Sequence, residues 1–183
     1  MNIDILNPEN ATYRCHSGCG SCCRYAIPLF PSEAFEISQG TGVLLPELVS
    51  LKKDQLYLSK TKRYCIFLDD TKNCGIHERT FMPFVCQTHP LRFNVDVTQS
   101  SVRIKVEKSS LSCHLGKKRR SVPEEDLTRL ADKAVRMYIA GTRAGKKPDL
   151  NAFCQNAFIL FENLSLEEAV QSVVGDVVNI SVI

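Results

Sequence analysis

The chain has 183 residues, of which 44% are hydrophobic and 23% are charged, as in a soluble globular protein of one domain. Its net charge of +3 is too small to indicate a nucleic-acid partner. No apolar run approaches the roughly 20 residues that a membrane helix needs, and residues 1–14 lack the basic and apolar segments of a secretory signal. We therefore expect a cytoplasmic protein with no membrane partner and no clear nucleic-acid partner.

The first predicted elements follow a dense cysteine segment. Residues 25–30 form a short apolar run, which predicts a strand ending near Pro31. A helix is expected next, with Ser32 as its N-cap and Gly40 or Gly42 as its stop. Residues 43–60 do not favour one structure, because Pro46 limits any helix there.

A β-hairpin is predicted in the middle of the chain. Residues 91–97 and 102–106 each alternate apolar and polar side chains, and the turn-like sequence TQSS joins them. One face of this hairpin should be buried. That face would carry Phe93, Val95, Val97, Val102, Ile104 and Val106.

The last third of the chain predicts three amphipathic helices. Ser121 and Glu124 have the spacing of a capping box, with Pro123 in the first turn, and Ser165 and Glu168 repeat this spacing. Because each helix has one apolar face, we expect the helices to pack on each other or on the hairpin. The apolar stripes contain Leu127, Leu130, Ala131, Ala134, Val135 and Tyr138, then Leu150, Phe153, Cys154, Ala157, Phe158 and Phe161, then Leu166, Ala169, Val170, Val173 and Val174.

The nine cysteines carry the main functional signal. Eight fall within residues 15–113, whereas Cys154 lies in an apolar helix stripe and is predicted to be a core residue. An odd number of cysteines in a reducing compartment disfavours a disulfide framework. Cys22 and Cys23 are also poor partners for each other, because consecutive Cα atoms lie about 3.8 Å apart and a disulfide needs about 4.4 Å. Metal binding by thiolates is the favoured interpretation.

The spacing of the cysteines predicts a nonlocal site. Only the segment RCHSGCGSCC, residues 14–23, has the short spacing that is usual in zinc fingers. The later cysteines must come from separate loops, so an N-terminal knuckle should close on loops from the middle of the chain. Eight thiols leave room for two zinc sites of four ligands, or for an iron–sulfur cluster with spare thiols. The candidate ligands are Cys15, Cys19, Cys22, Cys23, Cys65, Cys74, Cys86 and Cys113.

Other polar residues lie near these cysteines in the sequence. Each histidine is within three residues of a cysteine and is either a ligand, a donor to a ligand, or simply exposed. Basic residues flank the cysteines and either neutralise a thiolate site or face solvent. The run GKKRR at residues 116–120 is interpreted as a solvated loop. The histidines are His16, His77, His89 and His114, and the flanking basic residues are Arg14, Arg24, Lys62, Arg63, Arg79 and Arg92.

The ordered series C-x₃-C-x₂-C-C, C-I-F-L, C-G-I-H and P-F-V-C-Q-T-H-P resembles the CxxCxxCC family of zinc- or iron-chelating domains over residues 13–116. The resemblance implies that the first seven candidate cysteines bind metal, while Cys113 corresponds to a later family element. The first gap is one residue longer than is usual in the family. Met82-Pro83 stands where the family has Arg-Pro, and Arg79 is a candidate to supply the missing guanidinium.

We therefore expect an α+β fold in a single domain, residues 1–183. A loop-rich, metal-stapled cysteine core with a β-hairpin would occupy residues 13–116, and C-terminal helices would occupy residues 121–175. The expected function is chelation of zinc or iron, with an iron–sulfur cluster as one form and a protein as a further partner. Flagellin lysine N-methylases contain a related region. The alternative is thus an S-adenosylmethionine-dependent protein-lysine N-methyltransferase, although the chain is short and shows no motif for that cofactor.

Overall fold

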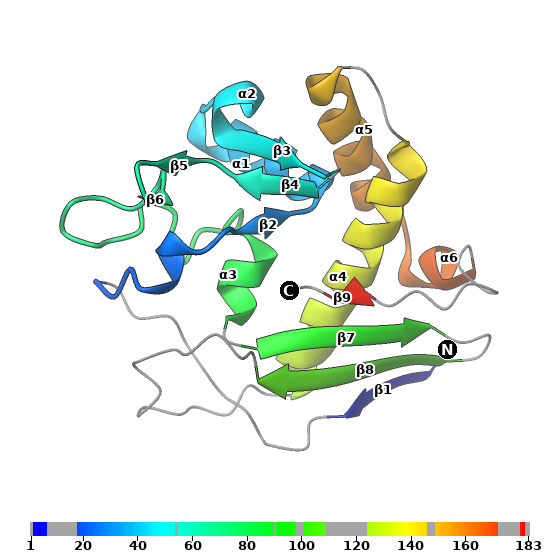
Figure 1. Cartoon of the computed structure of the whole chain (residues 1–183). Coiled ribbons are helices and arrows are strands. Elements are labelled where there is room, and N and C mark those ends of the chain that lie inside the picture. The colour runs from blue at the N-terminus through cyan, green and yellow to red at the C-terminus, as the bar shows by residue number, and fades with distance from the viewer. Residues whose placement is uncertain are drawn as a thin grey trace.

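The structure is a computed structural model that describes residues 2–6, 18–53, 55–89, 91–97, 101–108, 124–145, 149–171 and 180–181. It has an α+β fold, as predicted, with small sheets of four, three and two strands and a long helix, α4, that lies against the four-stranded sheet (Figure 1). The candidate ligands Cys15 and Cys113 lie outside the described residues, as do His16, His114 and residues 116–120.

An antiparallel three-stranded sheet of order β2-β4-β3 forms the end of the molecule that carries most of the cysteines. The strand predicted over residues 25–30 is reduced to two residues, because Tyr25 instead closes a turn on Cys22. The segment 43–60 resolves into a short helix and a hairpin. The elements here are β2 (Pro28–Leu29), α1 (Pro31–Thr41), α2 (Leu45–Leu48), β3 (Val49–Lys52), β4 (Gln55–Leu58), β5 (Lys60–Thr61) and β6 (Tyr64–Cys65).

Helix α1 begins two residues earlier than predicted. Its N-cap is Phe30, so the expectation that Ser32 caps the helix is wrong. The side chain that caps the helix is Glu33, whose Oε2 accepts the Phe30 N–H at 2.9 Å, so a hydroxyl is not needed. The predicted stop is confirmed at Gly42, which has a φ of 73° and donates its N–H to the Ser38 carbonyl at 2.9 Å.

The second sheet has the strand order β1-β8-β7-β9. The predicted hairpin is confirmed as the antiparallel pair β7–β8, in which Phe93 pairs with Val106, Val95 with Ile104 and Val97 with Val102. Which of its faces is buried lies outside the described side chains. β1 adds to β8 in parallel, and β9 adds to β7 in antiparallel orientation. The strands are β1 (Asn2–Leu6), β7 (Leu91–Val97), β8 (Ser101–Lys108) and β9 (Ile180–Ser181).

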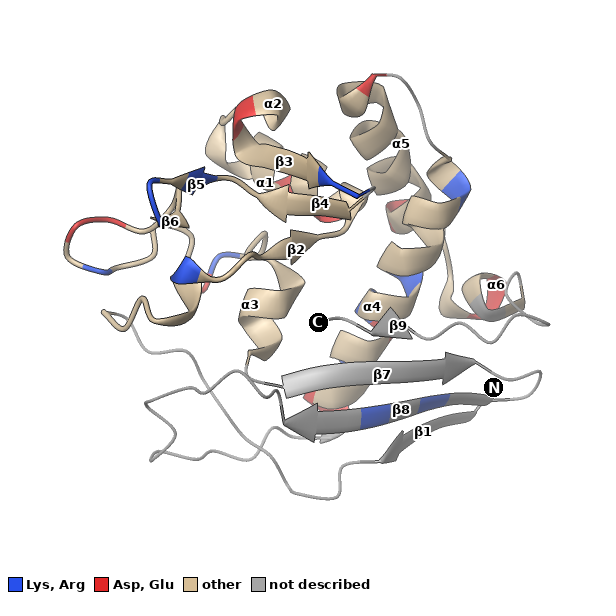
Figure 2. Ribbon diagram, viewed as in Figure 1, with Lys and Arg blue, Asp and Glu red and all other residues tan. Residues whose placement is uncertain are grey.

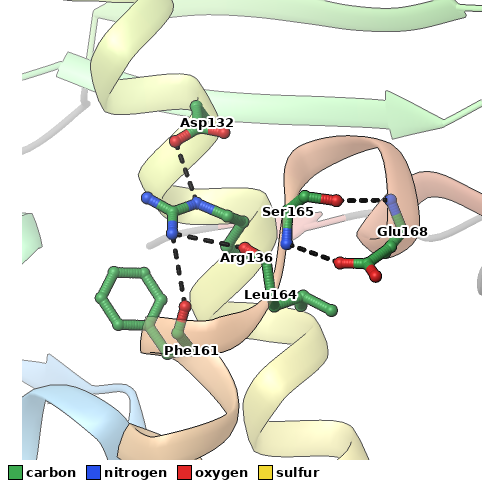
Figure 3. Close-up of polar contacts among 6 residues, drawn as sticks. All are labelled: Asp132, Arg136, Phe161, Leu164, Ser165 and Glu168. Carbon is green, nitrogen blue, oxygen red and sulfur yellow. Dashed lines mark hydrogen bonds and ion pairs between the residues drawn. The ribbon is translucent and has the colours of Figure 1, made fainter.

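The predicted C-terminal helices are α4 (Glu124–Ala144), α5 (Leu150–Asn163) and α6 (Leu166–Gln171). α4 packs on α5 and α6 and also contacts β1 and β7, which confirms the expected packing. The second capping box is confirmed at the start of α6 (Figure 3): Ser165 N–H donates to Glu168 Oε2 at 3.0 Å, and Glu168 N–H donates to Ser165 Oγ at 3.2 Å. The first capping box lies partly outside the described residues.

The hydrophobic core joins the cysteine-bearing end to the helices. Ile37 of α1 and Leu48 of α2 are fully buried, and α1 packs against α5. Cys154 of α5 is also fully buried in this core, as predicted. Among the described helices, none is both long and apolar enough to cross a bilayer. The segments that carry Cys23, Cys65 and Cys86 therefore pack on a hydrophobic core that they share with the helices.

Candidate metal centre

Three of the predicted ligands begin turns of the same kind. Each cysteine carbonyl accepts a hydrogen bond from the N–H three residues later, and Cys22 also begins the short 3₁₀ helix η1 (Cys22–Arg24). Such turns hold a side chain in a fixed direction at the start of a loop. The three bonds run from Tyr25 to Cys22 at 2.9 Å, from Leu68 to Cys65 at 3.0 Å and from His77 to Cys74 at 3.1 Å.

Two of these turns also direct a backbone N–H at the cysteine sulfur. Phe67 donates to the sulfur of Cys65, and Ile76 donates to the sulfur of Cys74. In both cases the donor lies two residues after the cysteine, so Cys65 and Cys74 have the same local geometry. An N–H aimed at sulfur favours the thiolate, which is the form that binds metal.

The two turns are tied to each other. Leu68 and Cys74 form an antiparallel bridge, and Gly75 donates its N–H to the Phe67 carbonyl at 2.8 Å. Asp69 supports the connecting loop, since its Oδ1 accepts the Asn73 N–H at 2.8 Å. The loop therefore folds back and brings the Cys65 turn beside the Cys74 turn.

The N-terminal cysteines lie against this loop. Gly18 and Gly20 have φ values of 79° and 58°, which favour glycine. A Cβ on Gly20 would lie only 3.2–3.3 Å from Leu68 and Lys72, so the backbone beside Cys19 approaches the loop closely. The described part of the predicted N-terminal knuckle, residues 18–23, therefore approaches a loop from the middle of the chain.

Basic residues of β5 and of the turn after it lie beside the cysteines. Lys60 of β5 pairs in register with Cys65, and its Nζ donates to the Arg24 carbonyl of η1 at 2.5 Å. Burial raises the pKa of Cys65 to about 11, while the charge of Lys60 and the Phe67 N–H act in the opposite direction. Two further basic residues, Lys62 and Arg63, are exposed in the turn between β5 and β6, and Figure 2 shows basic segments in blue beside these strands. These cations offset the negative charge that thiolates would gather.

The thiols act on one another electrostatically. The hydrogen bond with Cys22 is the largest cause of the raised pKa of Cys23, followed by burial. Burial is the largest cause of the raised pKa of Cys74 and Cys86, and the nearby Cys22 adds to the rise in both. Cys22 also adds to the rise at Cys65. Cys22 therefore lies in the electrostatic neighbourhood of four other predicted ligands, Cys23, Cys65, Cys74 and Cys86.

Cys86 reaches this neighbourhood from the short helix α3 (Phe84–Thr88). Cys65 is buried, and Cys23 and Cys86 pack against the hydrophobic core. Low polarity around the sulfurs favours neutral thiols when no cation is bound. The same low polarity strengthens the attraction between thiolates and a bound cation.

In the part of the chain that the structure describes, no group of three or more His, Cys, Asp or Glu side chains is arranged to hold a metal ion as it stands. His77 and His89 are both half-buried, and no contact assigns either a ligand role. The donor set is nonetheless soft sulfur with N–H support, which suits zinc, iron and iron–sulfur clusters.

Sequence reasoning missed one residue of this region, Glu33. Its carboxyl is buried and accepts the N–H of Phe84, the first residue of α3, at 2.5 Å. Burial raises its pKa to about 7, although the N–H groups of Phe30 and Phe84 lower it. No local signal could reveal this contact, because the two residues are 51 positions apart.

These features define a cysteine-cluster protein with a candidate thiolate metal centre. Residues 14–114 match the family model CxxCxxCC, described as "Putative zinc- or iron-chelating domain". Since the match covers more than half of the 183 residues, the chain belongs to this family. Comparisons with curated proteins and with solved structures gave no significant match.

Proposed function

We propose that this protein binds zinc or iron through the thiolates of its cysteine cluster. The observation that carries the proposal is the pair of equivalent turns at Cys65 and Cys74, each with an N–H aimed at its sulfur, beside Cys22. Free core cysteines have no need of such donors, whereas metal-bound thiolates are commonly stabilised by them. The proposed ligands are drawn from Cys15, Cys19, Cys22, Cys23, Cys65, Cys74, Cys86 and Cys113.

Binding would remove the proton from each thiol that becomes a ligand, because the thiolate is the form that binds metal. Cys65 belongs to the hydrophobic core and Cys86 packs against it, so the core holds these two thiols in place. When bound, the cation supplies the positive charge that holds several thiolates together, so its binding energy adds to the folding energy.

We further propose that the site holds either zinc or iron, with an iron–sulfur cluster as the form that uses the most thiols. Zinc takes four ligands at about 2.3 Å and is colourless, whereas an iron–sulfur cluster absorbs visible light. Reduced thiols are needed in either case, which favours the cytoplasm as the compartment.

Elemental analysis and a visible spectrum of protein purified without oxygen test the proposal. We expect at least one equivalent of zinc or iron, and a reductant should bleach the visible band if a cluster is present. Cys74→Ser should lower the metal content substantially, while Cys154→Ser, which alters a buried cysteine of the core, should leave it unchanged. Metal-free wild-type protein that cannot be loaded with either metal would show that the proposal is wrong.

The methyltransferase alternative rests on the resemblance to flagellin lysine N-methylases alone. A calorimetric titration with S-adenosylmethionine distinguishes it from simple metal binding. Heat of binding with a 1:1 endpoint would support the methyltransferase hypothesis. A titration of metal-loaded protein that shows no heat of binding would exclude it.

A further inference from the structure

Helix α1 lies along the segment that leads to Cys86. Near its start, Glu33 accepts the N–H of Phe84. Near its end, Gly40 faces Phe81, whose ring atoms would lie 2.5–2.9 Å from a Cβ on that glycine. Glu33 and Gly40 are two helical turns apart and thus lie on one face of α1. The segment 81–84 therefore runs antiparallel to α1 and is fixed to it at both ends.

Glu33 binds the first backbone N–H of α3. Only 3% of this residue is exposed, and its two carboxyl oxygens accept different N–H groups: Oε2 that of Phe30 at 2.9 Å, and Oε1 that of Phe84 at 2.5 Å. Phe84 is the first residue of α3 and is itself fully buried. Cys86 follows two residues later, so a displaced helix start would move its sulfur directly.

A carboxylate is suited to this position. Both of its oxygens accept hydrogen bonds, whereas a glutamine offers one accepting oxygen and would turn its NH₂ group toward one of the two N–H donors. A buried N–H that loses its acceptor is costly. Lys133 of the neighbouring helix α4 and Glu36 of α1 itself are the charged groups that act on Glu33, and Cys86 is the thiol that it influences.

We propose that Glu33 is a positioning residue of the metal centre: by holding the first N–H of α3, it directs Cys86 toward the other thiols. The inference rests on the proposed metal binding. It adds a residue from outside the cysteine series and a role for α1, which otherwise belongs to the hydrophobic core.

The test compares Glu33→Gln with Glu36→Gln in metal-loaded and metal-free protein. Glu36 lies on the same helix, is half-buried and is also near Lys133, but its described contacts include no hydrogen bond to α3. Competition with a chelator for zinc should show about tenfold weaker binding for Glu33→Gln and less than a twofold change for Glu36→Gln. In metal-free protein, Glu33→Gln should raise the alkylation rate of Cys86 relative to that of Cys154.

A second measurement uses the unaltered chain, so it does not depend on the folding of a variant. Because coupling is reciprocal, zinc binding should slow hydrogen exchange at the Phe84 amide as well as at the Phe67 and Ile76 amides that face sulfur. Slower exchange at Phe67 and Ile76 with no change at Phe84 would overturn the inference, as would equal zinc affinities for the two variants. Wild-type protein that binds neither zinc nor iron would instead refute the proposed function, and the alkylation ratio would then report on Glu33 by itself.

Discussion

The ring of Phe35 in α1 lies 5.3 Å from the ring of Phe158 in α5, with the two planes inclined by 38°. This aromatic contact joins the part of the chain matched by the family to a helix outside it. Cys154 and Ile37 extend the same shared core. Because the two parts bury each other's apolar surface, we propose that they fold as one cooperative unit, a single domain of residues 1–183.

The first prediction concerns removal of the metal. Chelation should lower the melting temperature of the whole chain, and not of a separate transition, because the cysteine loops pack on the core that α1 and α5 share. Far-ultraviolet circular dichroism, which the helices dominate, measures this with and without a strong chelator. An unchanged melting temperature in protein shown to have lost its metal would contradict the prediction.

The second prediction concerns the close approach of α1 and the segment before α3. Gly40→Ala should destabilise the protein, although alanine favours helix by about 1 kcal/mol. The new methyl group would lie 2.5 Å from the Phe81 ring, and overpacking costs about 1–3 kcal/mol. Gly75→Ala is the matched control, because its Cβ would meet only the Phe67 carbonyl at an ordinary 3.6 Å. Urea denaturation should show a lower midpoint for Gly40→Ala alone.

The third prediction concerns Arg136 of α4, which caps the end of α5 (Figure 3). Its guanidinium donates to Asp132 at 3.0 Å and to the carbonyls of Phe161 and Leu164 at 3.3 and 3.4 Å, and it lies 4.7 Å from the centre of the Phe161 ring. Arg136→Met should therefore lower the free energy of unfolding by about 1–2 kcal/mol.

The control for Arg136 lies two turns earlier on the same helix. Arg129 pairs with Asp126 at 3.1 Å, but 74% of its side chain is exposed, against 25% for Arg136. Exposed pairs contribute little, so Arg129→Met should change stability by less than about 0.5 kcal/mol. Equal losses for the two variants in chemical denaturation would mean that the cap on α5 contributes nothing.

The fourth prediction is a pH dependence that arises at Glu33. Burial raises its pKa from 4.5 to about 7 in the folded protein, so between these pH values the folded chain binds more protons than the unfolded chain. The stability that this group contributes is therefore complete below about pH 4.5 and is lost as the pH rises through 7, by up to about 3 kcal/mol. Other carboxyl groups titrate equally in both proteins. The difference in unfolding free energy between wild type and Glu33→Gln therefore reports on Glu33 alone. Denaturation of metal-free protein at pH 5 and pH 7.5 should show that difference shrink or change sign.

Local patterns predicted the regular elements well. The alternation in residues 91–97 and 102–106 predicted a hairpin, and the structure contains it as the antiparallel pair β7–β8. The start of α1 was placed wrongly at Ser32 because a side chain three residues into the helix, Glu33, caps it instead. The role of Glu33 toward Phe84 depends on tertiary contact and has no signature in the chain.

The sequence names the candidate cysteines but not how they are arranged. Dense thiols and their order predict a nonlocal cluster, and in the structure Cys22 contributes to the raised pKa of Cys23, Cys65, Cys74 and Cys86. The equivalent turns at Cys65 and Cys74 could not be read from spacing, because many sequences follow a cysteine with an apolar residue. Hydrogen bonds to sulfur appear only once the backbone conformation is known.

X-ray absorption spectroscopy at the metal edge tests the central claim most directly, because it counts sulfur atoms around the bound ion. We expect a first shell dominated by sulfur at about 2.3 Å in the wild-type protein, and a shell with one sulfur fewer in Cys65→Ser. A first shell of oxygen and nitrogen alone, at about 2.0–2.1 Å, would contradict the account.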